Sequence, residues 1–358
     1  MKKIIFDISA LHGFKSHSNR GIGRVVGNLA RCFREKFPEM SFLNLSDAGW
    51  FTNLLKILPK GEVFLRNHFF YPLNVLRNSS KQDFLFIPSQ TDVPFLVPRP
   101  YFLFVFDLIP FKHPEWYGSS SKPVRYKVAR YLESNGIKNA FHIFCCSELV
   151  KEDLQKLFGI PKEKLTVCPL GVDEVFLRFE RSKENCRAEL RFSGPTVLYF
   201  GGLDPRKKVD EVVQAAKNLK EIRFVFIVEE RAFRRTFPAP SNCLIVGHCV
   251  DELLACYIKS ADVVVFPSVE EGFGLPVFEA SVLETPVICR PIRPLVDYFG
   301  DNLVYIEKDL VNTLVDFFKY QEYFLTKAQG AKNVAKNFTW DQSATIITEV
   351  LRAKISGN

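Results

Sequence analysis

The sequence predicts an α/β protein with two domains in tandem, each built on a mainly parallel β-sheet that helices cover on both faces. Three observations support this prediction. The chain has 358 residues, more than the roughly 250 to 300 at which a single hydrophobic core stops growing. Its composition is globular, with 47% apolar and 25% charged residues. Short apolar runs alternate with amphipathic helical stretches in both halves, which is typical of a parallel sheet.

The first half of the chain contains six apolar runs that we expect to form strands. A helix over residues 148–158 is indicated by Ser147, which suits an N-cap position, and by acidic residues in the first turn. Further helices are expected over 20–37 and 123–138. The expected strands are 3–9, 40–46, 84–89, 101–107, 142–147 and 165–170.

The pattern starts again after a charged stretch at 176–195. We therefore predict a first domain over residues 1–180, a second over 190–337, and a last segment over 338–358. Ligands of open α/β folds bind beyond the carboxyl ends of the strands, so the expected site is a cleft that both sheets face. The expected strands of the second domain are 196–202, 223–228, 243–248, 262–268, 286–291 and 303–307.

No stretch of the chain predicts a membrane span. The longest apolar run, 101–111, is too short to cross a bilayer and contains Asp107. The first residues have the basic opening of a signal peptide, but Asp7 interrupts the apolar run and no convincing cleavage site follows. A cytoplasmic protein is therefore expected. Nine cysteines without a CxxC pair predict buried free thiols, and no His or Cys spacing predicts a metal site.

The net charge of +8 belongs entirely to the first half of the chain. Residues 1–175 hold 24 Lys and Arg against 16 Asp and Glu, whereas the remainder holds 24 of each kind. A basic half favours nucleic acid, an anionic membrane or a phosphorylated ligand as a partner. A solvated surface without a partner is the alternative.

The segment SVEEGFGLPVFEA, residues 268–280, is the first candidate binding site. It follows an apolar run and leads into a helix with Pro276 in its first turn. A glycine-bracketed loop before a helix offers free backbone N–H groups and the positive end of the helix dipole, which suit an anion or hydroxyl groups. The carboxylates of Glu271 and Glu279 suit the vicinal hydroxyls of a sugar or ribose. Alternatively, Glu279 only favours the helix start and Glu271 is solvated.

The segment 199–219, YFGGLDPRKKVDEVVQAAKNL, is the second candidate. A strand ends at a double glycine, and a basic turn with Arg206 and Lys207 precedes an amphipathic helix. Cations are unfavourable beside the positive end of a helix dipole, and a bound diphosphate would compensate them. The alternative is an ordinary basic surface turn.

Together the two segments resemble the retaining glycosyltransferases of family 4. The fold of that family, GT-B, consists of two Rossmann-like αβα domains facing each other across a cleft. Segment 267–288 carries the family's signature of two acids separated by seven residues, and 201–208 carries its glycine turn and Arg-Lys pair. The resemblance implies that the final helix, about 340–354, crosses back to the first domain. Further similar segments are 20–29, 106–117, 145–176 and 338–351.

The resemblance implies a donor site in the second domain and a catalytic set of Glu271, Asp107, Lys207 and Arg206. Arg206 and Lys207 would neutralise the diphosphate of a nucleotide sugar without an obligatory metal ion. Glu271 would hold the transferred sugar, Glu279 would bind the ribose, and Asp107 would orient the acceptor or the donor sugar. The backbone positions expected to bind substrate are Gly21, Gly23, Gly201, Gly202, Gly272, Phe273, Gly274 and Leu275.

The chain departs from the family at three positions. Gly202 stands where Arg is frequent, Glu284 stands where Gly is common, and Phe106 stands where many members have His before the aspartate. A His beside the sugar would bind its hydroxyls or share in proton transfer. Phe106 therefore bears directly on the acceptor-side chemistry.

We expect the enzyme to transfer a hexose, with retention, from a nucleotide diphosphate sugar to a glycan or lipid-linked acceptor in surface-polysaccharide synthesis (O-antigen, capsule or lipopolysaccharide). GDP-mannose is the first candidate donor and a UDP-hexose the second. One alternative is a GT-B-like protein that binds a nucleotide sugar or glycan without turnover. Another, an NAD-dependent oxidoreductase, rests only on the glycine spacing at 21–27, which lies too far behind the first strand for a dinucleotide site.

The acceptor is expected to meet the basic first domain. An aromatic-rich segment, 65–77, favours peripheral contact with an anionic membrane on its cytoplasmic side. The alternative is that these aromatics are core and the charges solvated. No nucleic acid is expected as a partner. The basic residues on which this expectation also depends are Lys122, Arg125, Lys127 and Arg130.

Overall fold

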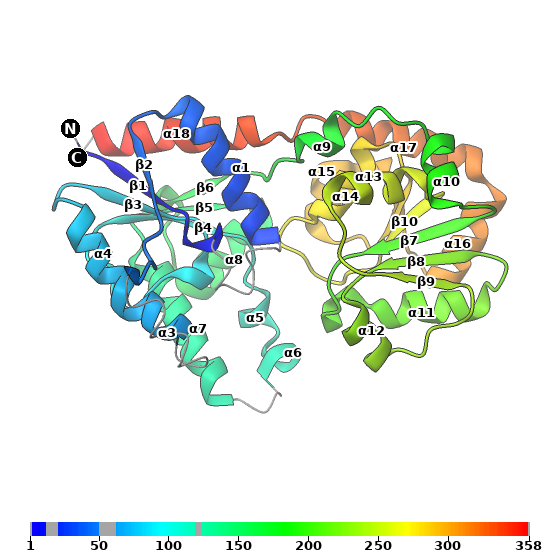
Figure 1. Cartoon of the computed structure of the whole chain (residues 1–358), viewed down its shortest axis with the longest axis horizontal. Coiled ribbons are helices and arrows are strands. Elements are labelled where there is room, and N and C mark those ends of the chain that lie inside the picture. Colours follow the sequence, from blue (N-terminus) through cyan, green and yellow to red (C-terminus); the bar gives the residue numbers. More distant parts are fainter. Residues whose placement is uncertain (1, 12–20, 50–61, 119–122, 357–358) are drawn as a thin grey trace. The chain divides into compact units, whose positions relative to one another are not determined.

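The computed structural model describes residues 2–11, 21–49, 62–118 and 123–356, and the chain forms two compact units (Figure 1). One unit comprises Met1–Gly171 together with Trp340–Asn358, and the other comprises Val172–Thr339. In the described residues each unit holds a six-stranded sheet in which all neighbouring strands are parallel. The predicted α/β architecture with two parallel sheets is confirmed.

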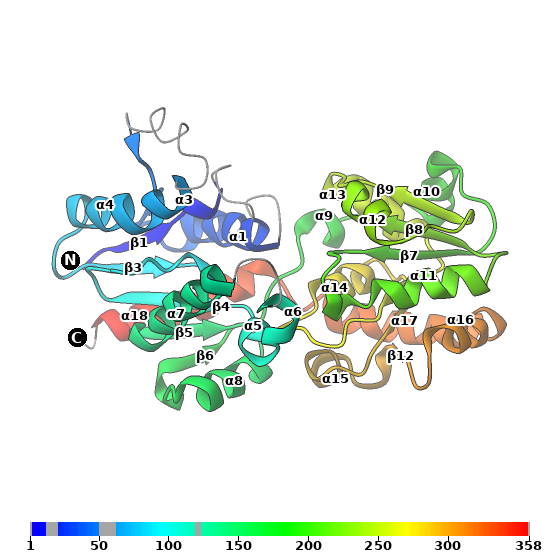
Figure 2. The ribbon, with the colours of Figure 1, turned by 90° about the horizontal axis from the view of Figure 1, so that it is seen from below.

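The sheet of the first unit has the strand order β2-β1-β3-β4-β5-β6. Helices α1 (Gly21–Lys36) and α18 (Trp340–Ser356) lie side by side over one face, and α4 (Tyr71–Asn78) and α7 (Pro123–Asn139) cover the other face (Figures 1 and 2). The strands are β1 (Ile4–Asp7), β2 (Met40–Leu43), β3 (Phe84–Ile87), β4 (Tyr101–Val105), β5 (His142–Cys145) and β6 (Leu165–Val167).

Phenylalanine rings fill much of the core of the first unit, which accounts for part of the 35 phenylalanines in the chain. Phe6 of β1 stacks on Phe86 of β3 with ring centroids 5.2 Å apart, and Phe86 lies 5.7 Å from Phe144 of β5. The other described elements of the unit are η1 (Ser9–Leu11), α3 (Glu62–Leu65), the π-helical turn η3 (Arg66–Phe70), η4 (Gln90–Asp92), α5 (Ile109–Lys112), α6 (Pro114–Gly118), α8 (Glu148–Phe158) and η5 (Lys162–Lys164).

The sheet of the second unit has the strand order β12-β11-β10-β7-β8-β9. Its strands are β7 (Thr196–Phe200), β8 (Arg223–Ile227), β9 (Cys243–Val246), β10 (Val263–Phe266), β11 (Val287–Cys289) and β12 (Val304–Tyr305). Its helices are α9 (Glu174–Leu177), α10 (Lys183–Leu190), η6 (Pro205–Lys207), α11 (Val209–Asn218), α12 (Glu230–Thr236), α13 (Asp251–Ser260), α14 (Leu275–Val282), α15 (Arg293–Phe299), η7 (Gly300–Asn302), α16 (Leu310–Lys319) and α17 (Gln321–Ala335).

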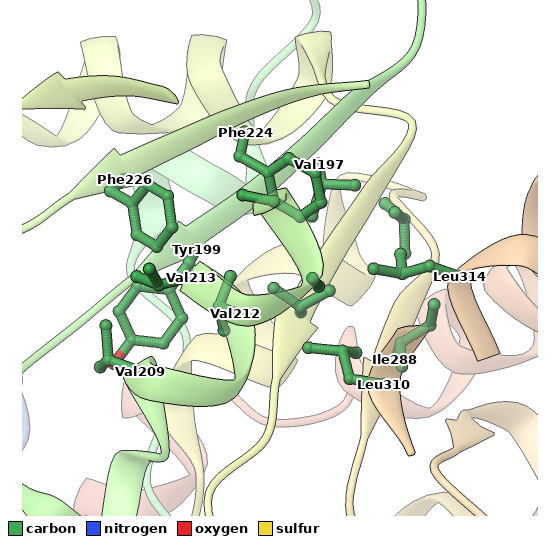
Figure 3. Close-up of a cluster of buried hydrophobic side chains, with 14 of the residues drawn as sticks. Val197, Tyr199, Val209, Val212, Val213, Phe224, Phe226, Ile288, Leu310 and Leu314 are labelled. Atoms are coloured by element: carbon green, nitrogen blue, oxygen red, sulfur yellow. The ribbon is translucent and has the colours of Figure 1, made fainter. Parts of the chain in front are cut away.

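Helices α11 and α16 bury one face of this second sheet (Figure 3). Val209, Val212 and Val213 come from one side of α11, because residues three and four apart share a helix face. They pack on Phe224 and Phe226 of β8 and on the neighbouring strands. Burying each such valine contributes about 1.5 kcal/mol or more, so this packing holds the start of α11 in place behind β7.

All twelve predicted strands are present among the described residues, but each ends earlier than its apolar run predicts. For example, the run 101–107 forms a strand only to Val105, and the run 262–268 forms one only to Phe266. The residues beyond these ends leave the ladder and form the loops at the carboxyl edge. That edge is where open parallel sheets bind ligands.

The nine cysteines all lie in the described residues and are free, and seven of them are buried. No helix in the described parts of the chain is long and apolar enough to cross a bilayer. The same parts contain no group of three His, Cys, Asp or Glu side chains arranged to hold a metal. Of the predicted basic positions, Lys122 lies outside the described residues.

Candidate functional site

The loop between β10 and α14 carries the segment SVEEGFGLPVFEA. Gly274 directly precedes α14 with a φ of 95°, in the region that favours glycine. A Cβ atom on Gly274 would also lie 2.9 Å from Cδ2 of the buried Leu295. Pro276 occupies the first turn of α14, where the absent N–H breaks no helical hydrogen bond. The backbone at 272–275 can therefore turn tightly into the helix only because residue 274 is glycine.

The loop between β7 and α11 carries the second segment. The chain leaves β7 through Gly201, which has a φ of 142°, and the hydroxyl of Tyr199 donates a hydrogen bond of 2.6 Å to the carbonyl of Gly202. The short turn η6 then presents Arg206 and Lys207 before α11 begins. Tyr199 is buried in the sheet, so its hydroxyl anchors the glycine turn to the core.

These two loops meet because β7 and β10 are neighbouring strands. The backbone N–H of Val269 donates to the carbonyl of Arg206 at 2.9 Å. The Arg206 guanidinium donates to the carbonyl of Glu270, also at 2.9 Å. The strand order reverses between β7 and β10, since β8 and β9 extend the sheet on one side and β11 and β12 on the other. Such a switch point is where open α/β sheets bind ligands.

A buried cluster of three charged side chains forms at this point. The Lys207 ammonium lies 2.5 Å from one oxygen of Glu271, and the Arg206 guanidinium lies 2.5 Å from the other. Lys207 and Glu271 are each only 8% exposed. Lys207 also lies over the ring of Phe266, 4.9 Å from its centroid, in the geometry of a cation–π contact. We call Arg206, Lys207 and Glu271 the charged cluster.

The charged cluster keeps Glu271 ionised. Burial opposes ionisation, but the adjacent Lys207 and Arg206 outweigh it and lower the pKa of the Glu271 carboxyl below its ordinary value. Burial lowers the pKa of the Lys207 ammonium, and Glu271 opposes that effect. With all three groups charged, the cluster carries one net positive charge. It can therefore attract an anion even though one carboxylate is already in place.

Two of the predicted ligand-binding residues in this unit also have packing roles. Phe273 is buried, and its ring stacks on Phe278 of α14 with centroids 4.4 Å apart and an interplanar angle of 11°. Tyr298 and Phe338 complete this aromatic cluster. Only the backbone of Phe273 is left to contact a ligand. Glu279, in the second turn of α14, is 2% exposed, so it is a buried acid rather than a solvated one.

Three predicted site residues belong to the other unit. Gly21 and Gly23 lie in the first turn of α1, where Gly23 is buried and a Cβ on Gly21 would meet nothing within 4 Å. Asp107 follows β4, and its carboxylate accepts a hydrogen bond of 3.2 Å from the backbone N–H of Ile109. Phe106, in the position where a His was considered, packs its ring 4.9 Å from that of Phe104.

Sequence reasoning missed several residues that support the site. Tyr199, Phe266 and Leu295 are ordinary apolar or aromatic positions in the sequence, and no local pattern sets them apart. Phe266 contacts Lys207 and Leu295 lies beside Gly274, and the residues of each pair are far apart in the chain. The bond from Tyr199 to Gly202 is local but depends on the direction of the tyrosine side chain. Pairing of Lys207 with Glu271 was also not predicted, although both residues were singled out.

A hollow of about 540 Å³ lies at the opposite edge of the same sheet. Pro195, Arg223 and Cys243, which are among its lining residues, stand at the amino ends of β7, β8 and β9. It is therefore separate from the loops that carry the charged cluster. Its other basic lining residues are Arg191 and Lys220.

The architecture is that of GT-B glycosyltransferases, as comparison with solved structures shows. A sucrose-phosphate synthase from Thermosynechococcus elongatus superposes with a TM-score of 0.76 over all of both chains, at 16% identity. HepE from Anabaena, solved with UDP and glucose, has a TM-score of 0.71 over 98% of this chain and 99% of its own, also at 16% identity. At such identities the likeness establishes the fold alone.

Matches to protein-family models identify the family of the chain, which likeness to solved structures alone does not. Residues 19–176 match the model described as Glycosyltransferase Family 4, and residues 194–318 match the one described as Glycosyl transferases group 1. The two matches together cover well over half of the sequence. The chain belongs to glycosyltransferase family 4.

Individual relatives with curated descriptions share about a quarter of their residues with this chain over the aligned part. The chain is 25% identical to O-antigen chain mannosyltransferase B of Escherichia coli, over 60% of this chain and 62% of the relative. It is 26% identical to a D-inositol 3-phosphate glycosyltransferase of Xylanimonas cellulosilytica, over 56% of this chain and 54% of the relative. The alignments thus span somewhat more than half the length of these relatives.

Replacing Gly274 tests the tight entry into α14. We expect Gly274→Ala to lower the free energy of unfolding by about 1 to 3 kcal/mol, because the left-handed backbone is strained for alanine and the new methyl group meets Leu295. Urea denaturation measures the difference. Gly247→Ala is the matched control, since a Cβ there has nothing within 4 Å. Equal effects of the two substitutions would contradict the assignment.

Replacing Glu271 tests the charged cluster and its pH dependence. Glu271→Gln leaves two buried cations facing each other, and we expect it to cost about 3 kcal/mol near neutral pH. Because the pKa of Glu271 is lowered in the folded protein, its stabilisation is present above the unfolded value of 4.5 and is lost as the pH falls toward the lowered value. The difference between variant and wild type should therefore shrink on acidification.

Urea denaturation of both proteins at about pH 7 and about pH 4 measures this change. Glu211→Gln is the control, because Glu211 pairs with Arg290 at 2.6 Å but both side chains are more than a quarter exposed. Solvent screens that pair, so its loss should cost less than about 1 kcal/mol. A difference for Glu271→Gln that grew on acidification would be incompatible with an ionised Glu271.

Proposed function

We propose that this protein is a retaining hexosyltransferase that takes its sugar from a nucleotide diphosphate donor bound at the charged cluster. One observation supports this most strongly. Two loops that carry Arg206, Lys207, Glu271 and a glycine-initiated helix meet beyond β7 and β10, where the strand order reverses. Membership of family 4 agrees with this placement.

The charges of the cluster suit the leaving group of the reaction. As the bond between the anomeric carbon and the phosphate oxygen breaks, the electron pair passes to that oxygen and negative charge grows on the diphosphate. Arg206 and Lys207 are held by Glu271, so they need not reorganise when this charge appears. Preorganised cations of this kind stabilise the transition state more than the ground state.

Each acid has a separate role in the proposed donor complex. Glu271, with the backbone of 272–275, would contact the hydroxyls of the transferred hexose, and Glu279 would accept hydrogen bonds from the ribose. Ionised carboxylates accept hydrogen bonds in pairs, and the lowered pKa of Glu271 fits that role. A lowered pKa also makes Glu271 unsuited to act as a general acid at neutral pH. In the first unit, Asp107 would orient the acceptor or the donor sugar, and Gly21 and Gly23 would let the backbone approach the substrate.

GDP-mannose is the first candidate donor and a UDP-hexose the second. Two relatives are O-antigen chain mannosyltransferases, from Escherichia coli and Salmonella typhimurium, at 25% and 24% identity. By this comparison the acceptor would be a glycan or lipid-linked oligosaccharide in surface-polysaccharide synthesis. Thermal shift with GDP, UDP, ADP and their sugars would identify the donor, since a ligand at 100 times its dissociation constant stabilises by about 2.7 kcal/mol.

Nucleotide release separates transfer from binding alone. If the donor that stabilises the protein is never consumed with any glycan acceptor, the protein is a nucleotide-sugar-binding protein of the same fold. If no nucleotide or nucleotide sugar stabilises it, the proposed donor site is wrong.

Replacing Lys207 tests the stabilisation of the leaving group. We expect Lys207→Met to lower kcat by about 10² to 10³, which corresponds to the loss of one preorganised charge-stabilising group. The measurement is nucleotide release at saturating donor, on protein shown to be folded by its unfolding temperature. Lys208→Met is the matched control, because Lys208 is the next residue and lies outside the charged cluster. Unchanged turnover in Lys207→Met would refute the assignment.

An apolar surface on the first unit supports contact with a membrane. Phe64, Phe69, Leu73 and Leu76 are between 49% and 59% exposed on the continuous helical stretch α3–η3–α4. The π-helical turn η3 adds a residue to one turn, which brings Phe64 and Phe69 closer to one line than an α-helix would. The N–H of Phe95 donates to His68 of this stretch at 3.0 Å, and Phe95 and Leu96 are also exposed. We call Phe64, Phe69, Leu73, Leu76, Phe95 and Leu96 the apolar face.

The charges of residues 63–100 and 123–139 in the first unit suit an anionic lipid surface. Every Asp and Glu within 63–100 and 123–139 is buried, whereas Arg77, Lys81 and Lys127 are exposed. An apolar surface with exposed cations and no exposed acids in these two stretches favours the anionic side of a bilayer. We therefore propose that the protein works at the cytoplasmic face of a membrane, where a lipid-linked acceptor would be presented.

Binding to lipid vesicles tests the apolar face. We expect the protein to sediment with vesicles of phosphatidylcholine and phosphatidylglycerol, less with phosphatidylcholine alone, and less at high salt. Leu73→Asp should weaken binding about 10-fold or more, since it removes a side chain worth about 1.5 kcal/mol or more when buried. Leu325→Asp is the control, because Leu325 is 55% exposed but lies on α17 of the other unit. Equal losses in the two variants, or no binding by the wild type, would contradict the proposal.

A further inference from the structure

The side chain of Gln90 forms two hydrogen bonds to the backbone around Asp107. The amide of Gln90 accepts a hydrogen bond of 3.2 Å from the N–H of Phe106 and donates one of 3.0 Å to the carbonyl of Asp107. Gln90 is 5% exposed and lies on η4, just after β3. β3 and β4 are neighbours in the sheet, so Gln90 continues the ladder with its side chain where β4 has ended. The position of Asp107 therefore depends on Gln90.

Glu133 of α7 lies close to Gln90, because α7 packs against η4. The Gln90 side chain lowers the pKa of the Glu133 carboxyl, so its –NH₂ group faces the carboxyl and favours the ionised form. Glu133 is only 4% exposed. Arg130, one turn earlier on α7, pairs with it. The Arg130 guanidinium itself lies 5.1 Å from the ring centre of Phe111 and 5.6 Å from that of Tyr126.

Burial of the Glu133 carboxyl lowers the stability of the folded protein. Burial raises the pKa of the Glu133 carboxyl to about 7, Arg130 opposes this, and the charge of Asp107 beyond β4 adds to it. Two carboxylates near each other with limited solvent disfavour the folded state at neutral pH. A neutral side chain of the same size would avoid the cost of burying the carboxyl, although it would leave Arg130 without this partner. An acid that destabilises the fold beside a site residue indicates a role in the site.

We propose that Glu133 is a positioning residue for Asp107: it orients the Gln90 amide, and Gln90 fixes the backbone of Phe106 and Asp107 at the end of β4. This inference rests on the proposed function, because it takes Asp107 to contact a substrate. It assigns a role to two residues, Gln90 and Glu133, that no sequence motif marks. Arg130 keeps the Glu133 carboxyl in place and offsets part of its charge.

A double-mutant cycle tests whether Glu133 acts through Gln90. Gln90→Met keeps the side-chain length but removes both bonds to the backbone, and Glu133→Ala removes the group that orients Gln90. Each single variant should lower kcat about 10- to 100-fold, the range expected when a reacting group is misplaced by about 1 Å. The double variant should be no slower than Gln90→Met alone. Effects that multiply would show that the residues act independently and would overturn the proposal.

Two further measurements separate positioning from general stability. The thermal shift caused by the donor nucleotide should be unchanged in all three variants, since the donor residues belong to the other unit. Glu62→Gln is the control variant, because Glu62 pairs at 2.9 Å with the buried Arg66 in the same unit and does not touch Gln90. It should keep wild-type kcat. A kcat as low as that of Glu133→Ala would mean that loss of any ion pair in this unit has the same effect, and would contradict the proposal.

Hydrogen exchange of the Phe106 amide tests the positioning of Asp107 without depending on sugar transfer. The amide N–H of Phe106 donates to Gln90, so it should exchange about 10-fold faster or more in Gln90→Met and in Glu133→Ala than in wild type. If wild type transfers no sugar but this acceleration is observed, the proposed function fails while the positioning of Asp107 by Glu133 stands. If the Phe106 amide exchanges at the wild-type rate in Glu133→Ala, the positioning role fails whatever the activity. Glu133→Gln, which keeps the shape of the side chain, serves as a second variant if Glu133→Ala does not fold.

Discussion

The contact of Glu271 with Lys207 and Arg206 is the interaction on which the proposed site depends. These residues are brought together by two loops that leave neighbouring strands, and both loops are too irregular to be held by sheet hydrogen bonds alone. The ion pairs and two hydrogen bonds to backbone carbonyls join the loops. A buried carboxylate alone would be costly, as would two buried cations. Each charge therefore lowers the free-energy cost of burying the others. The three groups together retain one positive charge.

This arrangement explains how cations can stand before α11 without a bound anion. The positive end of the helix dipole disfavours Arg206 and Lys207, and the sequence alone suggested that a ligand must compensate them. In the structure Glu271 provides part of that compensation. A diphosphate would then share the cations with Glu271 rather than create order in a disordered turn, which is the condition for low reorganisation during the reaction.

In the first unit, the candidate site residue Asp107 is also held by a side chain from a neighbouring loop. There the strand order reverses between β1 and β3, and the side chain that follows β3, Gln90, holds the backbone that follows β4. In both units a side chain hydrogen-bonds the backbone just beyond the end of a β-strand. Beyond the early ends of β4 and β10, side chains thus replace backbone pairing as hydrogen-bond partners of the main chain.

The sequence is sufficient to predict the strands, because buried parallel strands are continuous apolar runs such as 84–87 and 263–266. Local motifs also single out Glu271, Glu279, Arg206 and Lys207 as candidate site residues. The sequence does not predict which charges pair, because Lys207 and Glu271 are 64 residues apart and their contact depends on strand order. Glu133 is the clearest case of a residue beyond sequence reasoning, since an acid in a polar helix is ordinarily solvated and Glu133 is buried where α7 packs on its neighbours, η4 among them.

The most direct test of the proposed donor site is an experimental structure with the nucleoside diphosphate of the donor bound. We expect phosphate oxygens to lie within about 2.7 to 3.2 Å of Arg206 and Lys207, at ordinary hydrogen-bond distance, beyond the carboxyl ends of β7 and β10. A diphosphate bound instead in the hollow at the amino ends of β7, β8 and β9, against Arg191, Lys220 or Arg223, would contradict it.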